Sequence, residues 1–173
     1  MSNSVLERIK CHNGALDIGG IRYLLIRPDT IVQFQKAVEM ELGLARCAQL
    51  MAEGGLLGGS RSSKKYMEGG QQGEELVHYM CETGSGLGWG EFRLVEFDQE
   101  SKRFSVEVAG SAFAQAYGRS QRPVCHLIRG VFQGLGRWVF DHSTTCVETL
   151  CLSKGDKVCR FEISAAEEEA DGK

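Results

Sequence analysis

Alternation of apolar and polar positions predicts six short strands, which pair as three hairpins. The strands are expected at residues 15–18, 21–26, 89–97, 104–108, 144–152 and 157–163. Gly19 and Gly20 separate the first two strands and tolerate the positive φ of a two-residue turn. The last pair turns around Gly155. The chain therefore has the strands for an antiparallel sheet.

Apolar residues at helical spacing predict the remaining elements. Helices are expected over residues 30–53, 60–66 and 74–81, and over a segment that starts at Pro123 and ends near Asp141. The first helix is expected to stop at Gly54 and Gly55, because glycine favours the conformation that ends helices. Gly43 lies within that helix and costs about 1 kcal/mol relative to alanine, so a bend or a break there is the alternative.

The order of these elements predicts the fold class. Hairpin, helices, hairpin, helix and hairpin do not form a βαβ series, so we expect an α+β domain with an antiparallel sheet packed against several helices. The length of 173 residues suits one domain, which we place at residues 1–166. Residues 167–173 are acidic and are expected to form a flexible tail.

Composition excludes several classes of protein. The chain is 42% hydrophobic and 25% charged, which permits a sizeable core and excludes a long disordered protein. Apolar runs such as residues 23–26 are far shorter than the ~20 residues of a membrane-spanning helix. Residues 1–10 lack the pattern of a secretory signal. We therefore expect a soluble protein of the reducing cytoplasm.

The charge balance argues against nucleic acid as a direct partner. The net charge of −3 provides no excess of basic residues for a phosphate-binding surface. Four arginines nevertheless gather on and just before one predicted helix, at Arg119, Arg122, Arg129 and Arg137. A solvated helix face or an acidic partner surface explains them equally well.

The spacing of two cysteines suggests a metal site. Cys151 and Cys159 are symmetric about Gly155, so a hairpin centred there places their Cβ atoms ~4.5–5.5 Å apart. Two thiolates that bind one tetrahedral zinc ion need this kind of proximity. On residue pattern alone, two alternatives stay open for the pair, which are small buried hydrophobes or a cross-strand disulfide.

Two further residues would complete a set of four ligands. Glu148 lies three positions before Cys151, and in a regular strand an odd spacing points to opposite faces. Glu148 can therefore join the site only if a bulge or strong twist interrupts the strand. Cys125 can join if the start of the helix after Pro123 leans over the strand. A closed set of this kind favours structural zinc and no zinc catalysis.

The motif around these residues resembles the vinyl-4-reductase domain family. It comprises Pro123-Val124-Cys125, Gly130, Glu148, Cys151 and Cys159-Arg160-Phe161, and residues 22–28, the long helix containing Gly43 and residues 84–96 also look like the family. Its members include effector-sensing domains of bacterial activators that respond to phenols, and a bacteriochlorophyll-biosynthesis protein. The fold of the family is similar to that of subunits of the TRAPP vesicle-tethering complex.

This resemblance implies a cofactor, a function and partners. By analogy with the phenol sensors, Cys125, Glu148, Cys151 and Cys159 are expected to hold zinc. The resemblance further implies a homodimer that binds a small hydrophobic or aromatic molecule as a sensor or carrier, and a protein partner in signalling. The phenol sensors continue into an ATPase and a DNA-binding domain, so we expect this chain to act as a standalone domain.

Aromatic residues and one histidine are candidates for contact with the ligand. They are Trp89, Phe92, Phe113, Tyr117, His126, Phe132 and Trp138. Plain core packing is the alternative for most of them. Gly130 and Gly134 lie about one turn apart, which permits close approach of either a second backbone or a flat ligand. The phenol sensors carry a pocket tryptophan near residues 111–114, where this chain has none, so a ligand other than phenol is expected.

Two other functions remain as alternatives. The name of the family favours an accessory factor or reductase in tetrapyrrole (bacteriochlorophyll) biosynthesis, although no nicotinamide or flavin motif supports a reductase acting alone. An interaction scaffold similar to the tethering subunits is the third hypothesis. We favour a binding domain over an enzyme, and turnover of a reduced cofactor would reverse that order.

Overall fold

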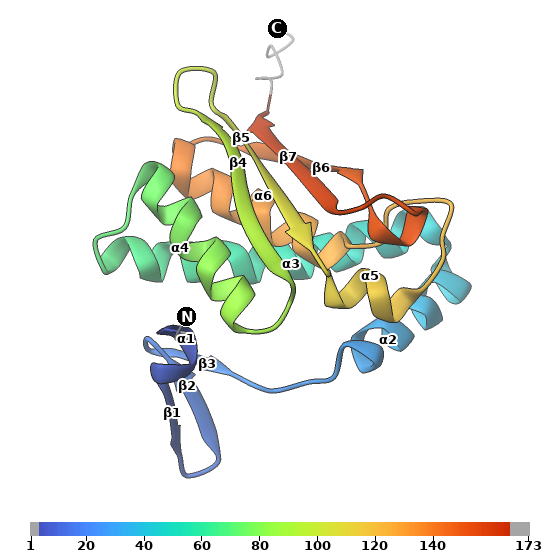
Figure 1. Ribbon diagram of the computed structural model, residues 1–173, viewed down its shortest axis with the longest axis horizontal. Helices are drawn as coiled ribbons and strands as arrows, with labels where there is room; N and C mark the ends of the chain where they lie inside the picture. The colour runs from blue at the N-terminus through green and yellow to red at the C-terminus, as the bar shows by residue number, and fades with distance from the viewer. Residues whose placement is uncertain (1–3, 167–173) are drawn as a thin grey trace, which may run out of the picture.

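The computed structural model describes residues 4–166, without the side chains of Ser4 and Leu6. A four-stranded antiparallel sheet is covered by helices, and a separate three-stranded sheet lies near the N-terminus (Figure 1). The predicted acidic tail at residues 167–173 falls outside the described residues. The extent of the domain therefore stays a prediction.

The main sheet has the strand order β4-β5-β7-β6, with every neighbouring pair antiparallel. Its strands are β4 (Glu91–Asp98), β5 (Arg103–Ala109), β6 (Thr144–Leu150) and β7 (Cys159–Ala165). Buried and exposed positions alternate along β6 and β7, so one face of the sheet is buried and the other faces solvent.

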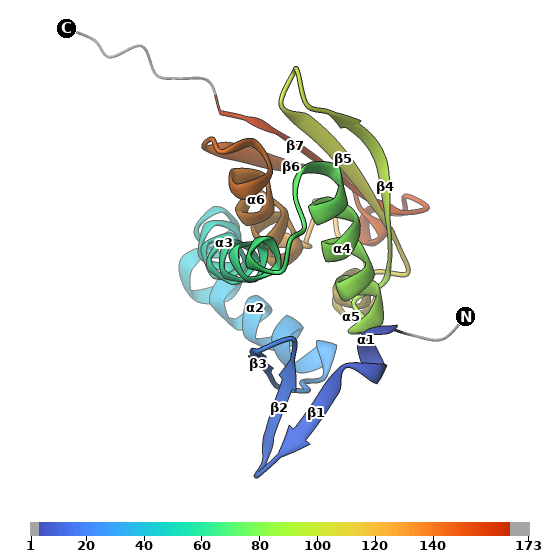
Figure 2. The same cartoon turned by 90° about the vertical axis from the view of Figure 1, so that its left-hand side faces the viewer.

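Helices cover the buried face of this sheet. The helices of the described residues are α1 (Ser4–Glu7), α2 (Pro28–Leu42), α3 (Leu44–Glu68), α4 (Gly73–Gly86), α5 (Ala112–Tyr117) and α6 (His126–Phe140). Helices α4 and α6 pack against the sheet, and α3 packs along the outer side of α6 (Figure 2). The apolar stripe of α6 places Ile128, Phe132 and Leu135 in the core, each at most 1% exposed.

The small sheet consists of β1 (Ile9–His12), β2 (Ala15–Ile18) and β3 (Ile21–Tyr23), in that order. An extended segment at residues 24–27 leads from it to α2 (Figure 1). Leu24 and Leu25 in this segment are 72% and 82% exposed. Ile26 is 50% exposed, so the link between the small sheet and the helices exposes three large apolar side chains.

The α+β class is confirmed, and so is the alternative of a break at Gly43, whereas the expected end of the helix at residues 54–55 is wrong. A break occurs at Gly43, where φ is 80°, so α2 and α3 are separate helices. The expected stop at residues 54–55 does not occur, because Gly55 serves a close contact with α6 instead of ending α3. A Cβ atom at Gly55 would lie 2.1 Å from the carbonyl oxygen of Leu127. The helix expected at residues 60–66 is the second half of α3.

Other differences concern element ends and short elements. Helix α4 continues beyond the expected 74–81 to Gly86, and β1 and α5 were not predicted. Strand β6 ends two residues earlier than expected and β7 begins two residues later, because the 3-10 turn η1 (Leu152–Lys154) occupies part of the connection between them. None of the helices within residues 4–166 is both long enough and apolar enough to cross a membrane.

Candidate metal centre and ligand cavities

Four side chains meet where the β6–β7 hairpin approaches the start of α6. They are Cys125, Glu148, Cys151 and Cys159, all buried, and their candidate ligand atoms lie within 4.8 Å of one another. The Sγ atoms of Cys125 and Cys159 are 3.7 Å apart, close to the separation of two thiolates at ~2.3 Å from one tetrahedral ion. The structure therefore brings together all four residues of the motif.

A β-bulge places Glu148 and Cys151 on the same side of the hairpin. Glu148 pairs with Phe161, whereas Leu150 pairs with Arg160, so the register shifts between the two positions. The extra residue shifts the alternation of side chains by one position. Two residues an odd number of positions apart can then point to the same side of the strand. A bulge of this kind was the condition for Glu148 to join the predicted site.

Hydrogen bonds hold the backbone around this cluster. The N–H of Cys151 donates to Asp156 Oδ2 at 2.8 Å, and the N–H of Leu152 donates to Cys159 Sγ at 3.4 Å. On the side of α6, the N–H of Cys125 donates to Glu148 Oε2 at 2.9 Å. The cluster thus links the final hairpin to Cys125, the residue directly before the helix that packs on the sheet.

The pKa values reflect four acidic groups crowded into one buried space. Burial and the neighbouring Cys151 raise the pKa of Glu148 to about 8. Hydrogen bonds with Cys151 and Cys159, together with burial, raise the pKa of the Cys125 thiol far above its usual range. Hydrogen bonds from Cys125 and Cys159 lower the pKa of Cys151. Several negative charges cannot gather there unless a cation balances them.

The donor set fits a metal ion. Glu148 Oε1 is buried and has no hydrogen-bond partner among the described residues, as expected of an oxygen that faces an ion. The cysteines are free thiols, so the alternative of a disulfide between Cys151 and Cys159 is not what the structure shows. Three sulfurs and one carboxylate oxygen would close a four-coordinate site, which leaves no position for a substrate.

One cavity lies between α3, α4 and α6, and we name it the helical cavity. Its volume is about 380 Å³, and its wall includes Trp89, Phe92 and Phe132. Gly54 and Gly58 form part of the same wall, and a Cβ atom at either position would meet nothing within 4 Å. The two glycines therefore leave space that larger residues would fill.

A second cavity, the hairpin cavity, adjoins the first. It measures about 280 Å³ and lies between the small sheet, the segment at residues 24–26 and the loop before β4. Tyr23, Trp89 and Leu127 line both cavities. The Trp89 ring meets Phe113 edge to face, with centroids 5.1 Å apart. Together the two cavities form a mainly apolar region that reaches from the helices to the small sheet, with Arg22 and Arg61 also in the lining of the helical cavity.

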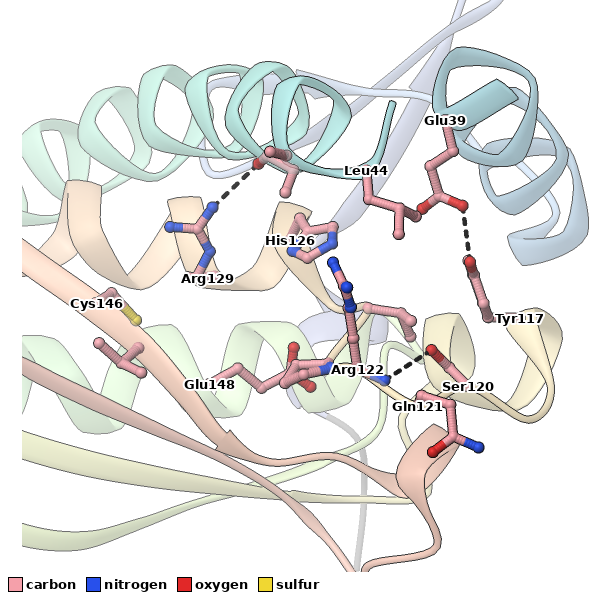
Figure 3. A pocket seen from close by; sticks show the side chains of 15 residues that line it. Glu39, Leu44, Tyr117, Ser120, Gln121, Arg122, His126, Arg129, Cys146 and Glu148 are labelled. Atoms are coloured by element: carbon pink, nitrogen blue, oxygen red, sulfur yellow. Dashed lines mark hydrogen bonds between the residues drawn. The ribbon is translucent and has the colours of Figure 1, made fainter. Parts of the chain in front are cut away.

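A third cavity of about 610 Å³ lies between α3, the loop before α6 and β6, and we name it the basic cavity (Figure 3). Arg122, His126 and Arg129 line it. Burial and the nearby Arg129 lower the pKa of His126, so its ring is neutral at pH 7. Tyr117, at the rim, donates to Glu39 Oε2 at 2.7 Å, and burial and this bond raise the pKa of Tyr117 to about 12.

The predicted ligand contacts do not converge on one site. Trp89, Phe92 and Phe132 line the helical cavity, Phe113 the hairpin cavity, and Tyr117 and His126 the basic cavity. Trp138 lines none of the three, and its Nε1 donates to Ser60 Oγ at 2.8 Å. Whether any of the seven contacts a ligand stays a prediction.

Gly130 and Gly134 serve the approach of a second backbone. A Cβ atom at Gly130 would lie 2.0 Å from the carbonyl oxygen of Ala52, and one at Gly134 would lie 2.4 Å from that of Leu56. Both carbonyls belong to α3. Of the two alternatives for this glycine pair, the structure shows helix packing.

Sequence reasoning missed the polar residues of the helical cavity. Tyr23 comes from β3, Ser62 from α3 and Thr83 from α4, so no local pattern connects them. The glycine pairs at residues 54–55 and 58–59 were a usable signal, because a repeat of small residues every four positions marks one face of a helix. That face carries both the contact with α6 and the wall of the cavity.

The comparison with protein families finds one match. Residues 104–165, which include the whole four-residue cluster, match the vinyl-4-reductase domain. A comparison with curated proteins finds no match.

Solved structures share the fold at low sequence identity. The phenol-responsive sensory domain of the transcription activator PoxR, determined with phenol, has a TM-score of 0.81 and 19% identity over 97% of this chain and 90% of that chain. A vinyl-4-reductase family protein from Methanocaldococcus jannaschii has a TM-score of 0.57 and 14% identity over 84% and 85% of the two chains. A trafficking protein particle complex subunit 3 from Naegleria fowleri, covalently bound to palmitic acid, has a TM-score of 0.59 and 11% identity over 81% and 95%.

Proposed function

We propose that this chain, which carries a vinyl-4-reductase domain at residues 104–165, binds a small hydrophobic or aromatic molecule in the helical cavity and acts as a sensor or carrier. The observation that carries this proposal is the cavity itself, whose volume of about 380 Å³ falls within the range of small-molecule sites. Its aromatic wall and few polar groups match the usual composition of such sites.

The neighbours in fold support a hydrophobic ligand. The PoxR domain was determined with phenol, and the trafficking subunit carries palmitic acid. In this chain, the ring centroid of Phe132 lies 6.5 Å from that of Phe104 and 5.6 Å from that of Phe161, and all three residues are at most 2% exposed. Because these rings fill the space between α6 and the sheet, we place the ligand beside them, in the helical cavity, whose wall includes Phe132.

We infer that the ion in the four-residue cluster is zinc and that its role is structural. Three thiolates and one carboxylate are a donor set that zinc accepts in four-coordinate sites. An ion held by Cys125, Glu148, Cys151 and Cys159 would fix the start of α6 to the end of the β6–β7 hairpin. Such an ion stabilises the helix that forms one wall of the helical cavity.

We also propose that the chain forms a homodimer in the cytoplasm. Helix α2 exposes Phe34 and Met40, at 63% and 85%, next to Leu42 and Leu44 at its junction with α3. Exposed apolar side chains that cluster in this way are typical of protein interfaces. The free thiols are consistent with a reducing compartment. A protein partner that reads the bound state would complete a sensor.

Titration of two probes, phenol and decanoate, tests the position of the ligand. Trp89 lines the helical cavity, so binding there should change tryptophan fluorescence. Gly58→Leu should abolish binding, because the new side chain fills the cavity without a clash at its Cβ atom. Lys64→Leu introduces the same residue at an exposed position of α3 and should leave binding unchanged. Equal binding by both variants would refute the helical cavity as the site.

A further inference from the structure

We propose that the basic cavity is a second ligand site, separate from the helical cavity, and that it takes a small organic carboxylate with an apolar body. The two sites share no lining residue and lie on different sides of α6. With a volume of about 610 Å³, the basic cavity has the size of a small-molecule site.

The charges around the basic cavity favour an anion. Arg122 and Arg129 both line it, and neither forms an ion pair with any residue between positions 4 and 166. Among the described residues, the side chain of Arg129 forms one hydrogen bond, from Nη2 to the carbonyl oxygen of Ala48 at 3.0 Å. Most N–H groups of the two guanidiniums are therefore available to a ligand. A guanidinium has a planar fork of donors that matches a carboxylate.

The two acidic residues of this cavity are already engaged. Glu39 Oε2 accepts from Tyr117, and Glu39 Oε1 accepts from Gln35 Nε2 at 3.0 Å. Glu148 belongs to the metal cluster, and its Oε2 accepts from the backbone N–H of Cys125. Neither carboxylate forms an ion pair with Arg122 or Arg129, so the guanidiniums retain their positive charge toward the cavity.

The apolar side chains in the wall of the basic cavity determine which kind of ligand body fits there. Ala45 and Ala48 from α3, Cys146 from β6 and Val124 from the loop before α6 contribute apolar side chains to the wall. These side chains are small and apolar, so they suit an aromatic ring or a short branched chain and not a sugar or a nucleotide. In Figure 3 the Arg122 side chain extends from the loop before α6 toward His126, which places the polar groups together and apart from Cys146.

Two segments of the chain contribute residues both to the proposed site and to the metal cluster. His126 follows Cys125, and Cys146 and Val147 precede Glu148 on β6. A carboxylate bound by Arg122 and Arg129 would therefore contact both elements that supply ligands to the metal. The alternative is that the same arginines only balance the negative charge of the cluster. Measurements of carboxylate binding and of metal binding in arginine variants separate these two roles.

Benzoate serves as the probe and benzamide as its neutral analogue, with metal-loaded protein and NMR amide shifts as the readout. We expect benzoate to shift the amides of Ala48 and Val147 in a saturable manner, and benzamide to leave them unchanged at the same concentration. Arg129→Gln should weaken benzoate binding by about tenfold, because a hydrogen bond to a charged group is lost. Arg122→Gln should weaken it severalfold, and it keeps the bond between Arg129 and Ala48.

The matched control is Arg137→Gln, which removes the same charge from the last turn of α6, away from the cavity. It should leave benzoate affinity unchanged. Trp89 fluorescence should not respond to benzoate at the concentrations that saturate these shifts, because Trp89 lines the other two cavities. Unchanged benzoate affinity in both the Arg122 and Arg129 variants, with weaker metal binding, would overturn the proposal and leave the arginines as counter-charges of the cluster. Equal shifts with benzamide would overturn it as well.

Discussion

The carboxylate of Glu148 accepts a 2.9 Å hydrogen bond from the backbone N–H of Cys125, across 23 residues of sequence. This bond joins the β6 strand to the residue directly before α6 without the help of an ion. It uses Oε2 and leaves Oε1 buried without a partner among the described residues. One residue thus contributes both to the backbone geometry of the site and to its donor set.

Loss of two thiols should remove the ion. We expect wild-type protein to contain one zinc per chain and Cys151→Ser, Cys159→Ser protein to contain none. Without the ion the free energy of unfolding should fall by roughly 3 kcal/mol or more, because the hairpin is no longer fixed to α6. Metal analysis and thermal unfolding measure both effects. Cys146→Ser is the control, since Cys146 is a buried thiol on β6 outside the cluster.

Metal binding should strengthen as pH rises from 6 to 8. The pKa of Glu148 is raised to about 8 by burial and by Cys151, so the carboxyl group is mainly protonated at pH 6 and must lose its proton to bind an ion. The metal-free protein should show the opposite trend. A pKa raised on folding gives stability that is complete below the unfolded value of 4.5 and is lost as pH rises toward 8.

Unfolding curves at several pH values, with and without zinc, check both trends. Glu148→Gln carries no titrating group at this position and should reduce the pH dependence of the metal-free form. A metal-free wild-type protein whose stability rises between pH 5 and pH 8 would contradict the assignment of Glu148 to this buried environment.

Much of the metal cluster was predictable from the sequence, and the reason lies in hairpin symmetry. Cys151 and Cys159 sit at equal distances from Gly155, so one turn is enough to bring them together. Glu148 needed a bulge, whose position no local residue pattern revealed, and Cys125 needed the packing of α6 on the sheet. For those two residues the family motif, and not the spacing alone, provided the prediction.

The helices were less predictable, because glycine has two opposite uses in this chain. At Gly43 a φ of 80° interrupts the helical path, as local reasoning allowed. At Gly55 the backbone is helical, and the absence of a side chain serves contact with α6. The two cases look alike in the sequence, since the difference depends on a partner helix about 75 residues further along the chain. The three cavities depend on the same long-range packing and were not predicted as separate sites.

Only one cysteine should react rapidly in the native protein. Cys11 on β1 is exposed, whereas the other six cysteines are buried. Burial also raises the pKa of Cys81 to about 12, which keeps that thiol protonated and unreactive. A thiol reagent such as Ellman's should therefore label one group per chain, and Cys11→Ser should label none. Addition of a strong chelator should then expose cluster thiols slowly, and rapid labelling of several groups before chelation would refute the buried placement.

Two glycines that look equivalent in the sequence should respond oppositely to alanine. In Gly130→Ala the new Cβ atom would lie 2.0 Å from the carbonyl oxygen of Ala52, so α3 and α6 must separate along their contact. We expect the free energy of unfolding to fall by roughly 2–4 kcal/mol. In Gly58→Ala the Cβ atom would meet nothing within 4 Å, and alanine favours the helix, so stability should rise by up to about 1 kcal/mol. Denaturant unfolding of both variants measures the difference, and equal stabilities would show that α3 and α6 do not approach as closely as their glycines allow.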